Sequence, residues 1–168
     1  MKKDAAYWIK HLQLTKHPEG GHFKEYYRSS LSITRSALPV SFNGNRSAST
    51  AIYFLLEKNE FSALHRIASD ELWHFYAGDG LVIYELMTDG SLQLHRLGND
   101  VDSGEVFQVV VRAGSWFGAS LDNGGEYALV GCTVAPGFDF EDFELAERSN
   151  LTERYPQHRE IIKLLTKG

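Results

Sequence analysis

Residues Phe61 to Gly80 read FSALHRIASDELWHFYAGDG, and the fold class follows from the pattern in this segment. Side chains alternate between the two faces of a strand. His65 therefore lies on one face of a first strand, and Glu71 and Trp73 share a face of the next strand. We expect His65 and Glu71 to meet across a hairpin inside a barrel. By the same alternation His74 points to the opposite side of its sheet.

Similar short apolar runs continue on both sides of this stretch. Breaks containing Gly, Asn and Asp separate runs rich in Val, Ile, Leu, Tyr and Phe, which is the chemistry of turns between strands. Regularly spaced short strands of this kind indicate a sandwich or a barrel. The expected strands cover residues 22–28, 50–56, 61–67, 71–77, 81–87, 91–97, 106–112, 115–119 and 126–134.

Short helices are expected at the two ends of the chain. Residues 4–14 carry apolar side chains at helical spacing with Asp4 as a possible N-cap, and residues 156–166 begin with Pro156. The polar region 29–49 reads as a long connection with a possible strand inside it. We expect one domain, 1–168, with a barrel core over about 22–146.

Composition excludes several classes of function. The net charge is −5 and both signs are interspersed, so a nucleic-acid partner has little electrostatic support. No apolar run approaches the roughly 20 residues of a membrane span, and the first residues lack a signal-peptide pattern. We therefore expect a cytoplasmic protein. The single cysteine, Cys132, lies in an apolar run and is expected to be a buried, inert thiol.

The central stretch resembles the first signature of the cupin superfamily, Gly-x5-His-x-His-x3–4-Glu-x6-Gly. His65, Glu71 and Gly78 are in register with it. Asn59 replaces the opening glycine, a mild change because Asn tolerates positive φ, whereas Ile67 replaces the second histidine. The second signature aligns with residues 106–121, where Gly114 is kept but Arg112 replaces the proline and Phe117 the last histidine.

Several further segments together resemble the type 5 cupin family. They span about residues 8–146 and include HPEGG (17–21), EYYRS (25–29), IYFLL (52–56), ALHR (63–66), ELWHFYAG (71–78), AGSWF (113–117) and VAPGF (134–138). The resemblance implies an all-β, double-stranded β-helix barrel of the jelly-roll type, usually a homodimer. It also implies a relationship to dTDP-sugar epimerases and germin-like proteins, but no settled reaction.

Metal-binding cupins supply three histidines and a glutamate, and this chain keeps His65 and Glu71 from that set. Two ligands are too few for a tight transition-metal site of the usual kind. We therefore expect the purified protein to contain no stoichiometric transition metal and no other cofactor.

A histidine and a carboxylate in an apolar pocket can transfer protons. The epimerase relatives pair a histidine base with a tyrosine acid, and Tyr27 or Tyr53 is the candidate acid here. A vestigial metal site, in which His65 and Glu71 only hydrogen-bond each other, is an equally open interpretation.

The strand at 22–28 offers further candidate ligand-binding groups. Alternation places Glu25 with Tyr27, and Tyr26 with Arg28, and Arg28 could clamp a phosphate or carboxylate at the pocket mouth. A solvated edge strand is the alternative. Four aromatic side chains are either core or a platform for a sugar ring or planar base: Trp73, Phe75, Trp116 and Phe117. The acidic aromatic run 138–143 is expected to be an arm packed on the barrel, with Asp139 and Glu141 in water and no chemical role.

Three classes of function stay open at this point. The preferred one is a metal-independent isomerase or epimerase acting on a sugar or nucleotide-linked sugar through His65 and Glu71. A non-catalytic protein that binds a small molecule is the second. A metal-dependent enzyme that borrows ligands from substrate or water is the third.

Overall fold

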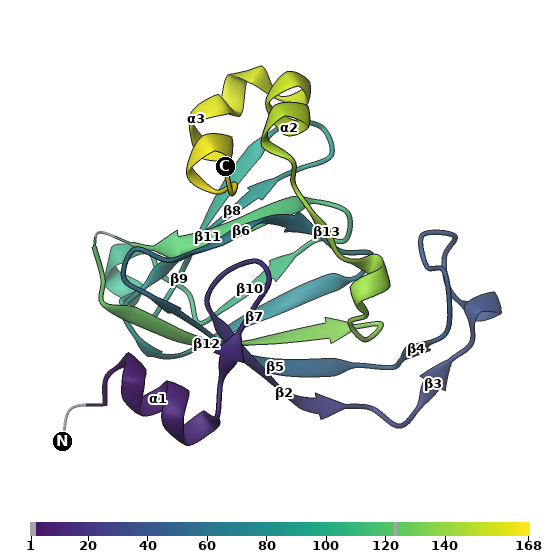
Figure 1. Ribbon diagram of the computed structural model, residues 1–168, viewed down its shortest axis with the longest axis horizontal. Helices are drawn as coiled ribbons and strands as arrows, with labels where there is room; N and C mark the ends of the chain where they lie inside the picture. Colours follow the sequence, from purple (N-terminus) through teal and green to yellow (C-terminus); the bar gives the residue numbers. More distant parts are fainter. Residues whose placement is uncertain (1–2, 123) are drawn as a thin grey trace.

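Two antiparallel sheets face each other in the computed structural model, which describes residues 3–122 and 124–168 (Figure 1). The larger sheet has the strand order β1-β2-β5-β12-β7-β10. Its strands are β1 (Thr15–Lys16), β2 (His22–Arg28), β5 (Thr50–Glu57), β12 (Tyr127–Ala135), β7 (Asp70–Gly78) and β10 (Gln108–Val111). The smaller sheet has the order β13-β6-β11-β8-β9. Its strands are β13 (Glu144–Leu145), β6 (Phe61–Arg66), β11 (Trp116–Leu121), β8 (Leu81–Leu86) and β9 (Leu92–Leu97).

This architecture confirms the expected jelly-roll barrel. Each predicted strand is present, with ends that differ by at most two residues. Asn59 has a φ of 67° and Gly78 a φ of 97°, so both occupy the backbone region expected for the ends of the first signature.

The segment between β6 and β7 corrects one prediction. These strands are consecutive along the chain but belong to different sheets, because the turn between them crosses the barrel. They therefore form no hairpin, and His65 and Glu71 project from opposite walls. No ion pair within 4.0 Å joins these two described residues.

The barrel interior follows from the alternation of side chains along most of the strands. Inward positions are apolar and form one continuous cluster that includes Phe54, Trp73, Ile83, Phe117 and Val130. Removing such side chains from water is the main favourable contribution to folding, roughly 1.5–3 kcal/mol for each one fully buried. His65 and Glu71 are also buried in this interior, where they are ionisable side chains among apolar ones.

Helices cover the outer faces of both sheets. Helix α1 (Ala5–Leu12) packs on the larger sheet near Leu55 and Leu129, and the Asp4 side chain caps it by accepting the Tyr7 N–H at 2.8 Å. Two helices, α2 (Arg148–Arg154) and α3 (Arg159–Leu164), cover the smaller sheet together with the 3-10 turn η4 (Pro156–His158). The predicted C-terminal helix is thus split, and α2 was not predicted. In the part of the chain that the structure describes, no helix is long and apolar enough to cross a membrane.

The region 29–49 forms an arm that extends from the barrel (Figure 1). It contains β3 (Ser32–Ile33), the 3-10 turn η1 (Arg35–Ala37) and β4 (Arg46–Ser47), and β3 pairs with β4. Arg46 is buried and donates two hydrogen bonds of 2.7 Å to the Asp142 carboxylate. This bidentate pair fastens the arm to the 3-10 turn η3 (Phe140–Asp142), next to one wall of the candidate site.

Candidate functional site

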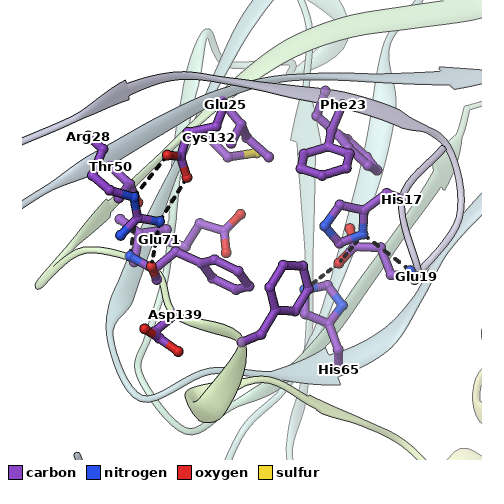
Figure 2. A pocket seen from close by; sticks show the side chains of 15 residues that line it. His17, Glu19, Phe23, Glu25, Arg28, Thr50, His65, Glu71, Cys132 and Asp139 are labelled. Atoms are coloured by element: carbon purple, nitrogen blue, oxygen red, sulfur yellow. Dashed lines mark hydrogen bonds and ion pairs between the residues drawn. The ribbon is translucent and has the colours of Figure 1, made fainter. Parts of the chain in front are cut away.

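A cavity of about 230 Å³ opens between the two sheets. Its walls come from the inner faces of β2, β5, β7 and β12, from β6, from the loop before β2, and from residues 138–140 (Figure 2). The lining residues are His17, Glu19, Phe23, Glu25, Arg28, Thr50, Ile52, Phe54, His65, Glu71, Cys132, Val134, Phe138, Asp139 and Phe140.

One side of the cavity carries His17, Glu19 and His65 (Figure 2). Glu19 Oε2 lies 3.2 Å from His65 Nε2 and 3.6 Å from His17 Nδ1. The other oxygen of Glu19 accepts a hydrogen bond of 2.7 Å from the Ser62 hydroxyl. Glu19, rather than Glu71, is therefore the carboxylate partner of His65.

The backbone determines which nitrogen of His65 is protonated. His65 Nδ1 lies 2.7 Å from the Ala63 carbonyl oxygen, which can only accept, so Nδ1 carries the proton and Nε2 is the basic nitrogen. Burial lowers the pKa of His65 to about 4, opposed in part by this hydrogen bond. Burial raises the pKa of Glu19. Both shifts favour the uncharged forms, and with a pKa of about 4 His65 is unprotonated at Nε2 at neutral pH.

Glu71 lies on the other side of the cavity, close to Cys132 (Figure 2). Burial, together with the negative charge of Glu19, raises the pKa of Glu71 to about 8, and a hydrogen bond with the Cys132 thiol opposes this shift. Glu71 is thus a neutral carboxylic acid at pH 7 and can donate a hydrogen bond or a proton. Cys132 is buried and free, as the sequence predicted.

Glu25 and Arg28 meet at the cavity mouth because β2 contains an irregularity. The register with β5 shifts between Glu25 and Tyr27, which breaks the simple alternation on which the sequence prediction relied. As a result Arg28 donates two hydrogen bonds to Glu25, at 2.9 and 2.8 Å, and a third to the Phe138 carbonyl at 3.0 Å. The Arg28 guanidinium, which was expected to bind an anionic ligand, is therefore already paired with Glu25.

The structure places several other predicted site residues away from the cavity. Tyr27 is half exposed outside it, and Tyr53 lies on the outer face, with its ring centroid 5.6 Å from that of Tyr26 and 6.1 Å from that of Tyr76. Neither tyrosine is positioned as the acid. The outer face also holds His74, which pairs with Thr133 at 3.2 Å and does not line the cavity.

The four candidate aromatic side chains are core residues. Trp73 is buried in the barrel interior, and Phe75 packs against the same cluster without lining the cavity. Phe117 supports the His65 ring, with ring centroids 4.1 Å apart. Trp116 faces the opposite side of its sheet, beneath the C-terminal helices. Of the two interpretations that the sequence left open, the structure supports core packing over a platform, because alternation decides which residues share a face but not which part of the interior stays open.

Sequence reasoning missed the two segments that complete the site. His17 and Glu19 belong to HPEGG, a segment that carried part of the family resemblance but was given no chemical role. A histidine and a carboxylate two residues apart are the signal that could have identified it. Phe138, Asp139 and Phe140 were assigned to an arm without chemistry, yet all three line the cavity. Residues 140–142 form a 3-10 turn rather than an extended strand, and this turn brings the run back over the barrel opening.

The barrel residues do not fit the transition-metal site of metal-binding cupins. Ile67 and Phe117 are buried hydrophobic residues at two ligand positions. His65 Nδ1 is held by the Ala63 carbonyl, so this histidine offers one ligand atom at most, Nε2 beside Glu19.

The fold and the pocket define a cupin, and the comparisons with known proteins place it more narrowly. Residues 6–146 match the model of the family described as Cupin superfamily (DUF985), Cupin_5, and the chain belongs to this family. The uncharacterized protein YML079W of Saccharomyces cerevisiae is 34% identical over 146 residues, covering 80% of this chain and 71% of the yeast protein.

Solved structures of similar proteins have the same fold as this chain. Protein SO0799 of Shewanella oneidensis superposes with a TM-score of 0.89 at 39% identity, with 99% of each chain covered. A protein of Leishmania major gives a TM-score of 0.89 at 36% identity, covering 98% of this chain and 99% of its own. Oxalate decarboxylase of Bacillus subtilis, at 14% identity and a TM-score of 0.53, covers 89% of this chain and 36% of its own, and shows the shared fold alone.

Proposed function

We propose that this protein is a metal-independent isomerase or epimerase that acts on a small, uncharged sugar-type carbonyl compound. One observation carries the proposal. Two titratable groups with oppositely shifted pKa values, His65 and Glu71, lie on opposite sides of one cavity (Figure 2). Pairs whose environments separate their pKa values in this way are the typical acid and base of an active site.

The proposed reaction uses each group in the protonation state that it has at neutral pH. His65 Nε2 accepts a proton from the carbon next to the substrate carbonyl, and Glu71 donates its proton to the carbonyl oxygen. The product of this step is an enediol. Glu71 then takes back a hydroxyl proton as a carbonyl group re-forms. Transfer of the proton on His65 to the neighbouring carbon gives isomerisation. Protonation of the same carbon from its opposite face by water, with His65 releasing its proton to solvent, gives epimerisation. Glu19 stabilises the protonated imidazole as it forms, since it lies 3.2 Å away.

The size of the cavity and its charged groups support a small, neutral substrate. A cavity of about 230 Å³ is below the roughly 300–1,000 Å³ of pockets that hold drug-sized ligands, so it suits one sugar ring better than an intact nucleotide sugar. Arg28 is already paired with Glu25 at the mouth, and Asp139 lies beside the same opening. A diphosphate would meet these carboxylates without a free cation from Arg28 to offset them.

The test is incorporation of solvent deuterium into a panel of unphosphorylated aldoses and ketoses, measured by mass spectrometry. The wild type should exchange the proton next to the carbonyl of at least one member of the panel. His65→Asn should slow this exchange by about 10²-fold or more while ligand binding stays nearly intact, and Glu71→Gln should also slow it. His74→Asn is the matched control, because His74 lies on the outer face, and should exchange at the wild-type rate.

Two outcomes would contradict the proposal. Binding of a sugar without any exchange would indicate a non-catalytic binding protein. Exchange that persists in His65→Asn would exclude this histidine as the base.

A further inference from the structure

A second group of ionisable side chains lies outside the barrel, where the larger sheet meets the turn after β5. His22 is the first residue of β2 and pairs with Leu55 of β5, so its side chain projects from the outer face, as does that of Glu57. Glu60 follows in the turn between β5 and β6. The ligand atoms of His22, Glu57 and Glu60 all lie within 4.8 Å of one another.

The imidazole of His22 has an unused nitrogen directed at both carboxylates. His22 is 8% exposed, and its Nδ1 is buried and has no hydrogen-bond partner. Nδ1 lies 3.8 Å from Glu57 Oε2 and 3.9 Å from Glu60 Oε2, too far for hydrogen bonds. An unpaired buried nitrogen costs free energy, so a group that completes its coordination would stabilise the fold.

The three atoms are spaced to hold a small cation. Bonds of 2.0–2.2 Å to a tetrahedral Zn²⁺ place neighbouring ligand atoms about 3.4 Å apart. The separations of 3.8 and 3.9 Å from His22 Nδ1 to the two carboxylates reach this value after side-chain shifts of about half an ångström. The two carboxylate oxygens lie within 4.8 Å of each other and would have to approach by up to about 1.4 Å. One nitrogen and two carboxylate oxygens suit zinc, and the half-exposed Glu57 leaves the site open to solvent for entry and for a water ligand.

The backbone and Lys16 hold Glu60 in position. Glu60 Oε2 accepts a hydrogen bond of 3.1 Å from the Glu57 N–H, and Glu60 Oε1 accepts one of 2.6 Å from Lys16 Nζ. The Glu60 N–H donates to the Glu57 carbonyl at 2.9 Å, and Asn59 closes the turn with its positive φ. Partners of this kind orient ligating carboxylates. Lys16 also competes for Glu60 as a cation, but it contacts the oxygen that faces away from His22.

We propose that His22, Glu57 and Glu60 form a structural binding site for a divalent zinc-type cation, which ties the start of β2 to the β5–β6 turn. The site lies on the outer face of the larger sheet and is independent of the proposed reaction in the barrel. It departs from the expectation of a metal-free protein, which considered only the barrel positions.

The test is a titration of the untagged, chelator-treated full chain with Zn²⁺, followed by calorimetry, and with Co²⁺, followed by visible absorption. The wild type should bind one ion per chain, and Zn²⁺ should raise its Tm. His22→Gln and Glu57→Gln should each weaken binding at least tenfold and abolish the rise in Tm. Glu57 is half exposed, so its variant should fold even if loss of His22 disturbs the sheet.

Two control variants identify the place of binding. Glu126→Gln removes a nearby exposed carboxylate that pairs with Lys58, and His65→Asn removes the barrel histidine. Both should bind Zn²⁺ as the wild type does. Binding weaker than millimolar in the wild type, or binding that is lost in His65→Asn but kept in His22→Gln, would overturn the proposal.

Discussion

Glu71 shows how a single residue acquires its chemistry from its surroundings. The side chain is buried beside Cys132, and no described arginine or lysine forms an ion pair with it. Burial, together with the charge of Glu19, raises its pKa to about 8. The same isolation that makes Glu71 a proton donor at neutral pH makes its ionisation costly for the fold.

We expect Glu71→Gln to change how stability depends on pH. In the wild type the pKa of Glu71 is about 8 in the folded state, against 4.5 for an ordinary glutamate. The folded state therefore binds the proton more tightly, and the contribution of Glu71 to stability falls as pH rises from about 4.5 to 8. Glutamine does not titrate. The free energy of unfolding of the variant should therefore rise relative to that of the wild type by up to a few kcal/mol over this pH range.

Urea unfolding at pH 5 and pH 8.5 measures this difference. Glu144→Gln, which alters an exposed carboxylate on β13, is the control and should show little change between the two pH values. A difference between Glu71→Gln and the wild type that is the same at both pH values would contradict a raised pKa.

At the scale of elements, the loop 17–21 connects β1 to β2 and brings Glu19 to His65. The Glu19 carbonyl accepts a hydrogen bond of 2.8 Å from the Ala63 N–H, which ties the loop to β6 beside His65. Gly20 has a φ of 114°, in the region that favours glycine, and it packs against the backbone of Phe61. The loop is thus held against the smaller sheet by backbone contacts.

Gly20→Ala should destabilise the protein more than Gly114→Ala. Both glycines have positive φ, so both variants pay about 1–2 kcal/mol of backbone strain. A Cβ at Gly20 would lie 2.2 Å from the Phe61 carbonyl oxygen, whereas one at Gly114 meets nothing within 4 Å. The steric clash should add about 1–3 kcal/mol at Gly20 alone. Equal free energies of unfolding for the two variants would show that the loop moves away from β6 without cost.

At the scale of the molecule, the two sheets are covered unequally. Helices α2 and α3 cover the smaller sheet, whereas α1 covers only part of the larger one (Figure 1). Tyr26 and Tyr76 remain exposed on the larger sheet, by 75% and 53%, and Val110 lies on the same outer side. Exposed aromatic and aliphatic side chains on one sheet face are typical of a protein interface.

We expect the protein to be a homodimer that buries this face against a second copy. Sedimentation velocity at tens of micromolar should show the dimer mass, and the double change Tyr26→Glu with Tyr76→Glu should give a folded monomer, because it places charges in the interface. Leu94→Glu, on the exposed side of β9, is the control and should remain dimeric. A wild-type monomer at this concentration would contradict the prediction.

The strands, the capped first helix and the family could all be predicted from the amino-acid sequence. These features depend on short-range properties: alternation along each strand, turn residues such as Asn59 and Gly78, and the Asp4 cap. The sequence also identified His65, Glu71, Glu25 and Arg28, all of which line the cavity, since charged or polar residues on an apolar inward face are visible in the pattern.

Which of these side chains contact one another depends on the folded barrel. The turn after β6 crosses to the other sheet, so His65 faces Glu19 from a distant loop instead of Glu71. The register shift in β2 pairs Arg28 with Glu25 and leaves Tyr27 outside. Alternation is a local property of one strand, whereas the choice of sheet and the position of a bulge depend on the packing of the whole barrel. The partners of the site residues were therefore not encoded in any pattern along the chain.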